Sequence, residues 1–257
     1  MQDFTNSALL FYARQLAEDA GEVAMSYFRR PLGIEVKEDL SPVTVADKAV
    51  EAFVRKRLAQ DFPNDGLFGE EEGAVGLDRA RVWVLDPIDG TRSFLSGYPT
   101  FGFLLAVLEH GAPKIGVVGM PALGEIYTGM DGVAACNGTE IRVSKQEDLA
   151  KAILYIHEAE HMREGDEGAF IRLLKAGATR RFAYDCYPHA LLAAGHIDAV
   201  VDYNLQPYDY LPLSALVEAA GGVISDWEGK PLSLHSDGRV ISAATPALHA
   251  QLLETVR

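Results

Sequence analysis

The chain has 257 residues, of which 48% are hydrophobic and 23% charged, and its net charge is −14. This length and balance are typical of a globular protein that buries a large core, which excludes a disordered or fibrous chain. The excess of acidic side chains predicts no nucleic-acid partner, because a phosphate backbone repels a negatively charged surface.

Targeting and redox features of the sequence are few. The longest apolar runs, such as residues 103–108, are too short to span a bilayer. The first residues lack the basic region and apolar stretch of a signal peptide. Cys136 and Cys186 form neither a metal-binding nor a disulfide pattern. We therefore expect a soluble, cytoplasmic protein with no membrane partner.

Helical spacing dominates the first sixty residues. Apolar positions predict a helix over residues 4–28 that ends before Pro31. Thr44 and Asp47 form a capping-box pattern, in which each side chain satisfies the other's backbone amide. The pattern predicts a second helix that ends at Phe62 and Pro63.

After residue 80 the pattern changes to strands and then alternates. Strands are expected over residues 81–85, 100–109, 114–120 and 125–130, with a turn at 110–113. Further on, helices are expected over 188–194, 209–220 and from 247, and strands over 199–203 and 223–226. Pro212 would lie in the first turn of its helix, where proline is tolerated. The mixture predicts a layered α/β sandwich.

Three acidic clusters lie where predicted elements end: residues 69–72, 86–91 and 207–209. In the second cluster, a buried strand leads Asp86 and Asp89 into a turn favoured by Gly90. Two desolvated carboxylates need a partner, and a hard cation with oxygen ligands is the natural one. The alternative is structural: a simple turn, a solvated acidic run, and Asp209 as an ordinary helix N-cap.

In order and spacing, these clusters and the following run 219–222 resemble the inositol monophosphatase superfamily. The similarity extends from residue 47 to 226, and the hexapeptide 86–91 is its strongest signature. It implies the αβαβα layered sandwich of the sugar-phosphatase type, a form of α/β (α+β) fold. It also implies two tightly joined halves, 1–140 with most metal ligands and 141–257 with Asp209. A homodimer and lithium sensitivity are implied by the resemblance alone.

The resemblance implies a role for each matching position. Glu70, Asp86 and the Ile88 carbonyl resemble a first metal site, and Asp86, Asp89 and Asp209 a second, for two or three Mg²⁺ ions. Thr91 and Glu70 resemble the catalytic pair that orients the attacking water, with Asp47 as the acidic partner of Thr91. The residues expected to bind substrate are Asp89, Gly90, Thr91, Asp185, Asp202 and Asp209. A metal ion that activates water and another that stabilises the leaving alkoxide would hydrolyse a phosphomonoester without a covalent intermediate.

Several stretches resemble the histidinol-phosphate phosphatase branch more closely: 39–44, 83–94, 185–192, 205–211 and 225–229. They favour histidinol phosphate as the small phosphorylated substrate, and with it a role in histidine biosynthesis. Asp202 lies where inositol phosphatases often have a glutamate that holds substrate hydroxyls, and a shorter acid also suits an amino group or imidazole. Inositol 1-phosphate or another sugar phosphate is the alternative substrate. A regulatory protein that associates with the transcription machinery is an alternative of another class.

The run His157-Glu158-x-x-His161 matches a zinc-protease pattern, which requires both imidazoles on one helix. The polar, glycine-containing residues 162–167 favour a solvated loop or a loop at the substrate rim instead. The stretch 155–161 also departs from the usual sequence of the histidinol-phosphate phosphatase branch. His189 is expected to be a packing residue.

Overall fold

The computed structural model describes residues 5–31, 34–36 and 42–257, and within them two main sheets. The eight-stranded sheet has the order β10 (Thr139–Ile141), β9 (Val133–Cys136), β8 (Glu125–Met130), β7 (Ala112–Met120), β6 (Gly102–Glu109), β5 (Arg81–Asp89), β3 (Gly66–Gly69) and β4 (Gly73–Val75). Its neighbours are antiparallel except β3 and β5, which are parallel. The five-stranded sheet has the order β12 (Thr179–Ala183), β11 (Ile153–His157), β13 (Ala199–Asp202), β15 (Val240–Ala243) and β14 (Val223–Asp226). In it β12, β11 and β13 are parallel, while β15 is antiparallel to both its neighbours.

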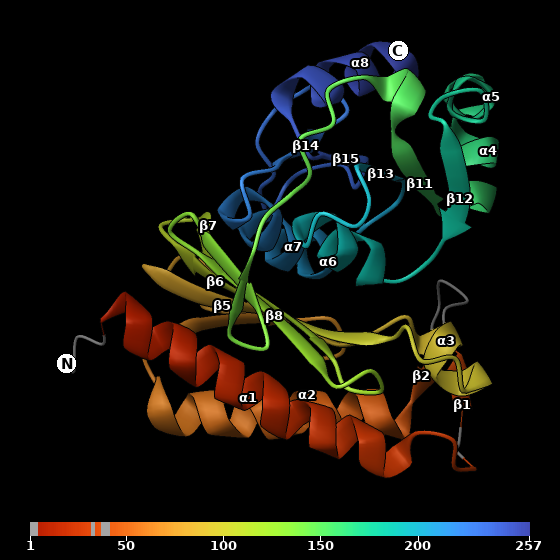
Figure 1. Cartoon of the computed structure of the whole chain (residues 1–257). Coiled ribbons are helices and arrows are strands. Elements are labelled where there is room, and N and C mark those ends of the chain that lie inside the picture. Colours follow the sequence, from red (N-terminus) through yellow and green to blue (C-terminus); the bar gives the residue numbers. More distant parts are fainter. Residues whose placement is uncertain (1–4, 32–33, 37–41) are drawn as a thin grey trace.

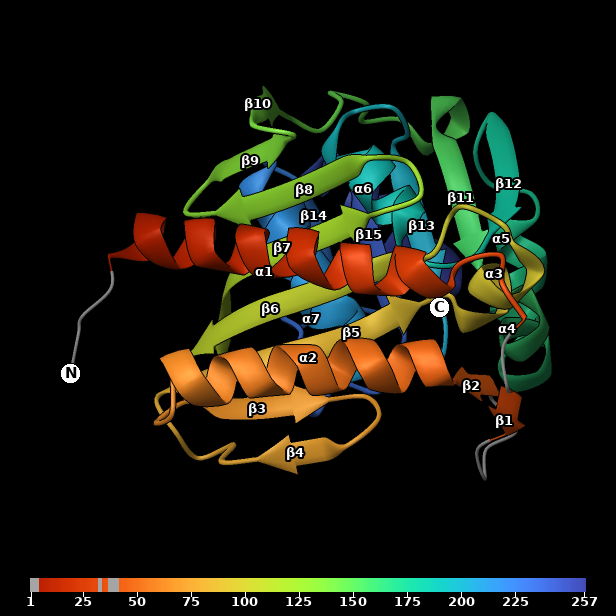
Figure 2. The same ribbon diagram turned by 90° about the horizontal axis from the view of Figure 1, so that it is seen from below.

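Helices separate and cover the two sheets in five layers (Figure 1). The first layer is α1 (Asn6–Tyr27) and α2 (Val45–Asp61), which lie across the larger sheet (Figure 2). The middle layer is α6 (Tyr187–Ala193) and α7 (Pro207–Ala219), and the outer layer is α4 (Ala159–Gly165), α5 (Glu167–Leu173) and α8 (Pro246–Val256). Short elements complete the chain: β1 (Ile34–Val36), β2 (Pro42–Thr44), α3 (Thr91–Ser96) and a 3₁₀ turn, Leu149–Lys151. The αβαβα sandwich is thus confirmed.

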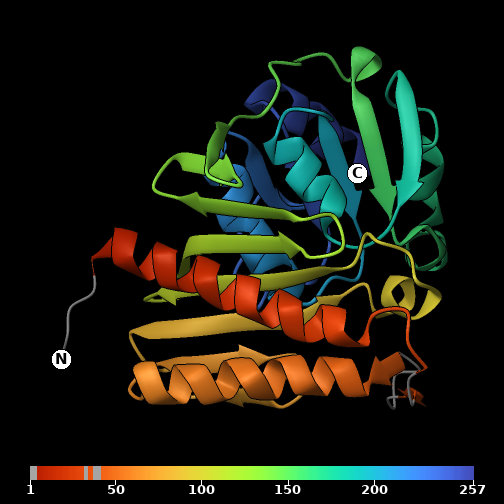
Figure 3. The ribbon, with the colours of Figure 1, turned by 60° about the horizontal axis from the view of Figure 1, so that its bottom comes forward.

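Alternation along β5 explains why the larger sheet is covered on both faces. Val82 and Val84 pack in one buried cluster with the middle helices, whereas Trp83 and Leu85 pack in another with α1 and α2. Successive side chains of a strand point to opposite faces, so an unbroken apolar strand requires a layer on each side. Figure 3 shows the sheet between these layers.

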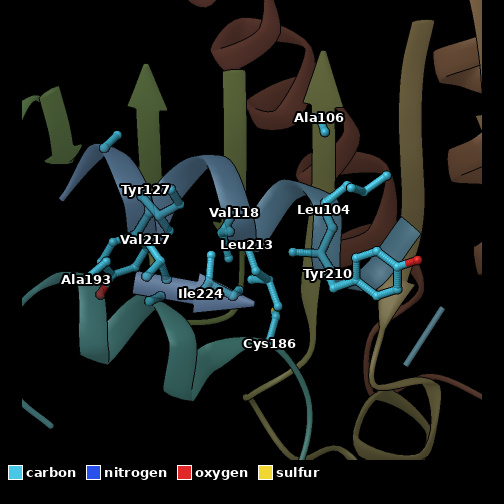
Figure 4. Close-up of a cluster of buried hydrophobic side chains, with 14 of the residues drawn as sticks. Leu104, Ala106, Val118, Tyr127, Cys186, Ala193, Tyr210, Leu213, Val217 and Ile224 are labelled. Carbon is cyan, nitrogen blue, oxygen red and sulfur yellow. The ribbon is translucent and has the colours of Figure 1, made fainter. Parts of the chain in front are cut away.

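Helix α7 packs against the larger sheet although it follows the second sheet's strands in sequence (Figure 4). A Cβ atom at Gly116 would lie 2.2 Å from the Pro212 carbonyl oxygen, so glycine in β7 permits this close approach. Leu213 and Val217 enter the same buried cluster as Leu104 and Val118 of the sheet. The division into halves 1–140 and 141–257 stays a prediction, but this core joins residues from both.

The predicted helices and strands named above correspond to elements of the structure, with three differences. Helix α7 begins at Pro207, so Pro212 lies inside the helix and not in its first turn, and Asp209 is its third residue rather than its N-cap. Residues 155–161 form the end of β11 and the start of α4 rather than a loop. Residue 4 of the first predicted helix and residues 39–41 of the branch-like stretch lie outside the described residues. In the described ranges, no helix combines the length and apolarity needed to cross a bilayer.

Candidate active site

The carboxyl end of β5 carries the first acidic pair. Asp86 is 3% exposed, and its Oδ1 accepts a hydrogen bond of 2.9 Å from the Ile88 amide. The register against β6 shifts between Asp86 and Asp89, which breaks the alternation of the strand. Asp89 is half-buried and accepts a hydrogen bond from the Cys186 amide. Gly90 then takes φ +84°, which favours glycine, and α3 begins at Thr91.

Helix α7 brings the third aspartate to this pair. Asp209 Oδ2 accepts a hydrogen bond of 2.7 Å from the Gln206 amide in a capping box, which orients the carboxylate at the helix start. Asp86, Asp89 and Asp209 each offer an oxygen, and these oxygens lie within 4.8 Å of one another. The three predicted aspartates therefore meet at one point.

The ionised form of these three carboxyl groups is disfavoured where they meet. Burial, and next the charge of Glu70, raise the pKa of Asp86 well above its ordinary value. Burial and the charge of Asp185 raise the pKa of Asp89, and burial raises the pKa of Asp209 to about 7. Like carboxylates in a desolvated cluster disfavour one another's ionised form, and a bound divalent cation reverses this. The donor set, all oxygen, fits a hard ion such as Mg²⁺.

The turn that follows Glu70 is held by a residue that the sequence analysis did not identify. The Glu51 carboxylate is fully buried and accepts hydrogen bonds from the amides of Glu71 (2.8 Å) and Glu72 (3.0 Å). Arg55, one turn further along α2, pairs with Glu51 at 2.7 Å. An i,i+4 acid–arginine pair is visible in the sequence, but its burial and its backbone partners are not.

Asp47 makes both contacts that its position suggested. Its Oδ2 accepts hydrogen bonds from the Thr44 amide (2.8 Å) and hydroxyl (2.5 Å), which completes the predicted capping box. Its Oδ1 accepts a hydrogen bond of 3.2 Å from the Thr91 hydroxyl. The start of α2 therefore fixes the side chain of Thr91 beside the acidic cluster.

Asp185 lies opposite Gly90. Its Oδ2 accepts hydrogen bonds of 2.6 Å from both the Ser93 and Thr100 hydroxyls. A Cβ atom on Gly90 would lie 2.4 Å from Asp185 Oδ1, so only glycine leaves room for this contact. The structure thus brings Asp185 to the turn that follows the acidic pair.

Asp202 lies between two histidines, His189 and His157. His189 Nε2 donates a hydrogen bond of 2.6 Å to its Oδ2, and His157 Nδ1 lies 2.9 Å from its Oδ1. Burial alone would raise the pKa of Asp202, but the two imidazoles lower it well below its ordinary value. Sequence analysis expected His189 to be a packing residue and missed its carboxylate partner. His157 was noticed only through the zinc-protease pattern.

That zinc-protease geometry is not formed. His157 ends strand β11, whereas His161 lies in α4, where its Nδ1 is 2.7 Å from Glu158 Oε2. The two imidazoles are therefore not stacked one turn apart on a single helix.

One cavity of about 500 Å³ joins these groups. Its lining includes Glu70, Asp89, Gly90, Thr91 and Asp209, and also Asp185, His189, Asp202 and His157. A phosphate group with a small alcohol fits such a volume. Three predicted site residues do not line the cavity themselves: Asp86, Ile88 and Asp47. Asp86 lies with Asp89 and Asp209, and Asp47 accepts a hydrogen bond from Thr91.

Comparison with known proteins agrees with this arrangement. The family model described as "Inositol monophosphatase family" matches residues 5–257. The chain belongs to the inositol monophosphatase family, whose members are phosphatases, hydrolases of phosphoric monoesters.

Three individual proteins of known class are similar to this chain. The chain is 38% identical over 251 residues to the bifunctional phosphatase IMPL2, chloroplastic, of Arabidopsis thaliana, covering 94% of this chain and 72% of the relative. It is 36% identical to the histidinol-phosphatase of Chlorobaculum parvum, covering 95% of each. The solved structure of an inositol monophosphatase from Zymomonas mobilis superposes with a TM-score of 0.89 at 36% identity, over 98% of this chain and 99% of that one.

Proposed function

We propose that the protein is a Mg²⁺-dependent phosphatase that hydrolyses histidinol phosphate to histidinol. The observation that carries the metal dependence is the meeting of Asp86, Asp89 and Asp209 within 4.8 Å, with raised pKa values. The substrate rests on the similarity to histidinol-phosphatases of three bacteria, at 31–36% identity. Inositol 1-phosphate is the second candidate, since the Zymomonas inositol monophosphatase is equally similar at 36%.

In this proposal, two or three Mg²⁺ ions would be held by two sets of oxygen ligands: Glu70, Asp86 and the Ile88 carbonyl, and Asp86, Asp89 and Asp209. The ions supply Lewis acidity that lowers the pKa of water and neutralises the phosphate. The chain's own residues hold the ions, orient the attacking water and bind the phosphate. Because burial raises the pKa values of Asp86, Asp89 and Asp209, bound cations would favour the ionised form of these carboxylates.

Thr91 and Glu70 orient the attacking water in the proposed mechanism. The Thr91 hydroxyl donates to Asp47 Oδ1, so its oxygen lone pairs can accept a hydrogen bond from a water in the cavity and orient it. Asp47 keeps this geometry because the capping box holds its other oxygen. The amides of Gly90 and Thr91, at the start of α3, would bind phosphate oxygens in this proposal.

The decisive experiment measures phosphate release with Mg²⁺ from histidinol phosphate and from myo-inositol 1-phosphate under identical conditions. We expect kcat/KM to favour histidinol phosphate by about a hundredfold, or about 3 kcal/mol. The reverse ratio would assign the protein to inositol phosphate. An Asp89→Asn variant should lose at least a hundredfold in activity on either substrate. Asp237→Asn, which changes an exposed acid paired with Arg239, is the matched control.

Further expectations about the molecule's context remain predictions. A homodimer is one, and sedimentation analysis of the purified protein tests it. A cytoplasmic location is another, and fractionation of the source cells tests it.

A further inference from the structure

The cavity is also lined by a buried group of two histidines and an aspartate, which defines its histidine end. His157 ends β11 and Asp202 ends the neighbouring parallel strand β13, while His189 projects from α6. The strands pair Ile156 with Val201, so the next residues on each strand fall side by side. All three side chains are almost fully buried, with exposures of 3%, 0% and 1% for His157, Asp202 and His189.

Both ring nitrogens of His189 have hydrogen-bond partners. The Asp202 carboxylate stays ionised beside the imidazoles, so His189 Nε2 is a donor to Oδ2. Burial lowers the pKa of His189, which keeps its ring neutral. A neutral ring that donates through Nε2 must accept through Nδ1, where Ser242 Oγ lies at 3.0 Å. His189 is thus a saturated support for Asp202.

Beside His157, two buried acceptor atoms lack an aligned hydrogen-bond partner. His157 Nδ1 forms an ion pair with Asp202 Oδ1 at 2.9 Å, so the carboxylate favours a proton on Nδ1, the tautomer in which Nε2 is an acceptor. Within the described residues, neither Nε2 nor Oδ1 has an aligned hydrogen-bond partner. Both residues line the cavity. Buried polar atoms are almost always satisfied, so two that are unsatisfied beside a cavity indicate a ligand that supplies donors.

Charge indicates what kind of donor. The group carries the negative charge of Asp202 with two imidazoles, and Glu158 and Glu160 line the same end of the cavity. Arg92 is the one arginine or lysine among the described residues that line it. An N–H donor with positive charge therefore suits this end better than a polyol hydroxyl.

We infer that Asp202 Oδ1 and His157 Nε2 bind an N–H group, an amine or azole, of the alcohol that leaves the phosphate. This inference rests on the proposed function and adds a residue that decides specificity. The sequence analysis gave this part of substrate binding to Asp202 alone, and in this inference His157 shares it. His189 positions Asp202 without contacting the ligand.

The test compares His157→Asn and His157→Gln with the wild type. Asparagine places its amide near the position of Nδ1 and removes the Nε2 acceptor, whereas glutamine places an amide oxygen near Nε2. His249→Asn is the matched control, because it removes a buried imidazole that contacts Ser225 outside the cavity. The readouts are kcat/KM on histidinol phosphate and on myo-inositol 1-phosphate, and inhibition by histidinol and by inorganic phosphate.

We expect His157→Asn to reduce the preference for histidinol phosphate at least tenfold and to raise the inhibition constant of histidinol by a similar factor. The inhibition constant of phosphate and turnover of inositol 1-phosphate should change less than threefold, and His157→Gln should retain more of the preference. A variant that keeps the wild-type preference would overturn the inference. So would stoichiometric zinc binding that is lost in His157→Asn while the preference is kept, because the group would then be a metal site. A wild type without any preference contradicts the proposed function itself, which separates the two failures.

Discussion

Glu51→Gln is the substitution that best tests how the first acidic cluster, residues 69–72, is held. The glutamate is fully buried and accepts two backbone hydrogen bonds at 2.8 and 3.0 Å, besides its ion pair with Arg55. Glutamine has nearly the same shape, but its amino group would face one of these donors and the charge would be lost. Hydrogen bonds to a charged group contribute about 1.5–3 kcal/mol each, and a broken buried pair costs about 3–5 kcal/mol. Since the Arg55 side chain is 17% exposed and can be rehydrated, we expect a loss of about 2–3 kcal/mol.

The assay is urea unfolding of the protein, combined with the Mg²⁺ dependence of phosphate release. The midpoint should fall with an unchanged slope, and the Mg²⁺ concentration for half-maximal activity should rise about tenfold, because Glu70 precedes the two amides that Glu51 holds. Glu18→Gln is the matched control: its i,i+4 pair with Arg14 is exposed, and it should cost about 0.5 kcal/mol or less. If Glu51→Gln behaves like this control in both measurements, the buried carboxylate does not position the loop.

Three other predictions follow from the site. Burial raises the pKa of Asp209 to about 7. Without metal, the folded state therefore binds more protons than the unfolded state between about pH 4 and 7. The melting temperature of the metal-free protein should fall as pH rises through this range, and Mg²⁺ should reverse the loss. Thr91→Ala should lower kcat at least a hundredfold, the usual size for a proton-transfer group, while Thr91→Ser, which keeps the hydroxyl bonded to Asp47, should lower it less than tenfold. Gly90→Ala should reduce both stability and activity, since φ is +84° and the new Cβ would meet Asp185 at 2.4 Å; thermal melts and phosphate release measure the two effects.

Local patterns in the sequence determine much of this protein. The apolar run of β5 predicts a strand covered on both faces, and Thr44 with Asp47 predicts the start of α2. The acidic clusters at residues 69–72, 86–91 and 207–209 predict a common site, because each follows or begins an element whose end is visible in the sequence. These features depend on neighbours within a few residues, and their physical chemistry is local.

Contacts between distant segments were decided only by the tertiary structure. Glu51 receives its backbone partners from residues twenty and twenty-one positions away, and nothing in its own helix shows which loop will lie there. Pro212 is tolerated inside α7 because the helix is stabilised by packing on Gly116 and the sheet, which outweighs a missing hydrogen bond.

The histidine pair shows the same limit most clearly. His157 was placed in a loop by its polar neighbours and His189 in a core by its apolar ones, yet both meet Asp202 in the cavity. Their meeting requires β11 and β13 to pair in parallel and α6 to pack behind them, across 45 and 13 residues of sequence. Residue type and local periodicity set which groups can bind charge, but only the pairing of strands and the packing of helices set which of these groups face one another.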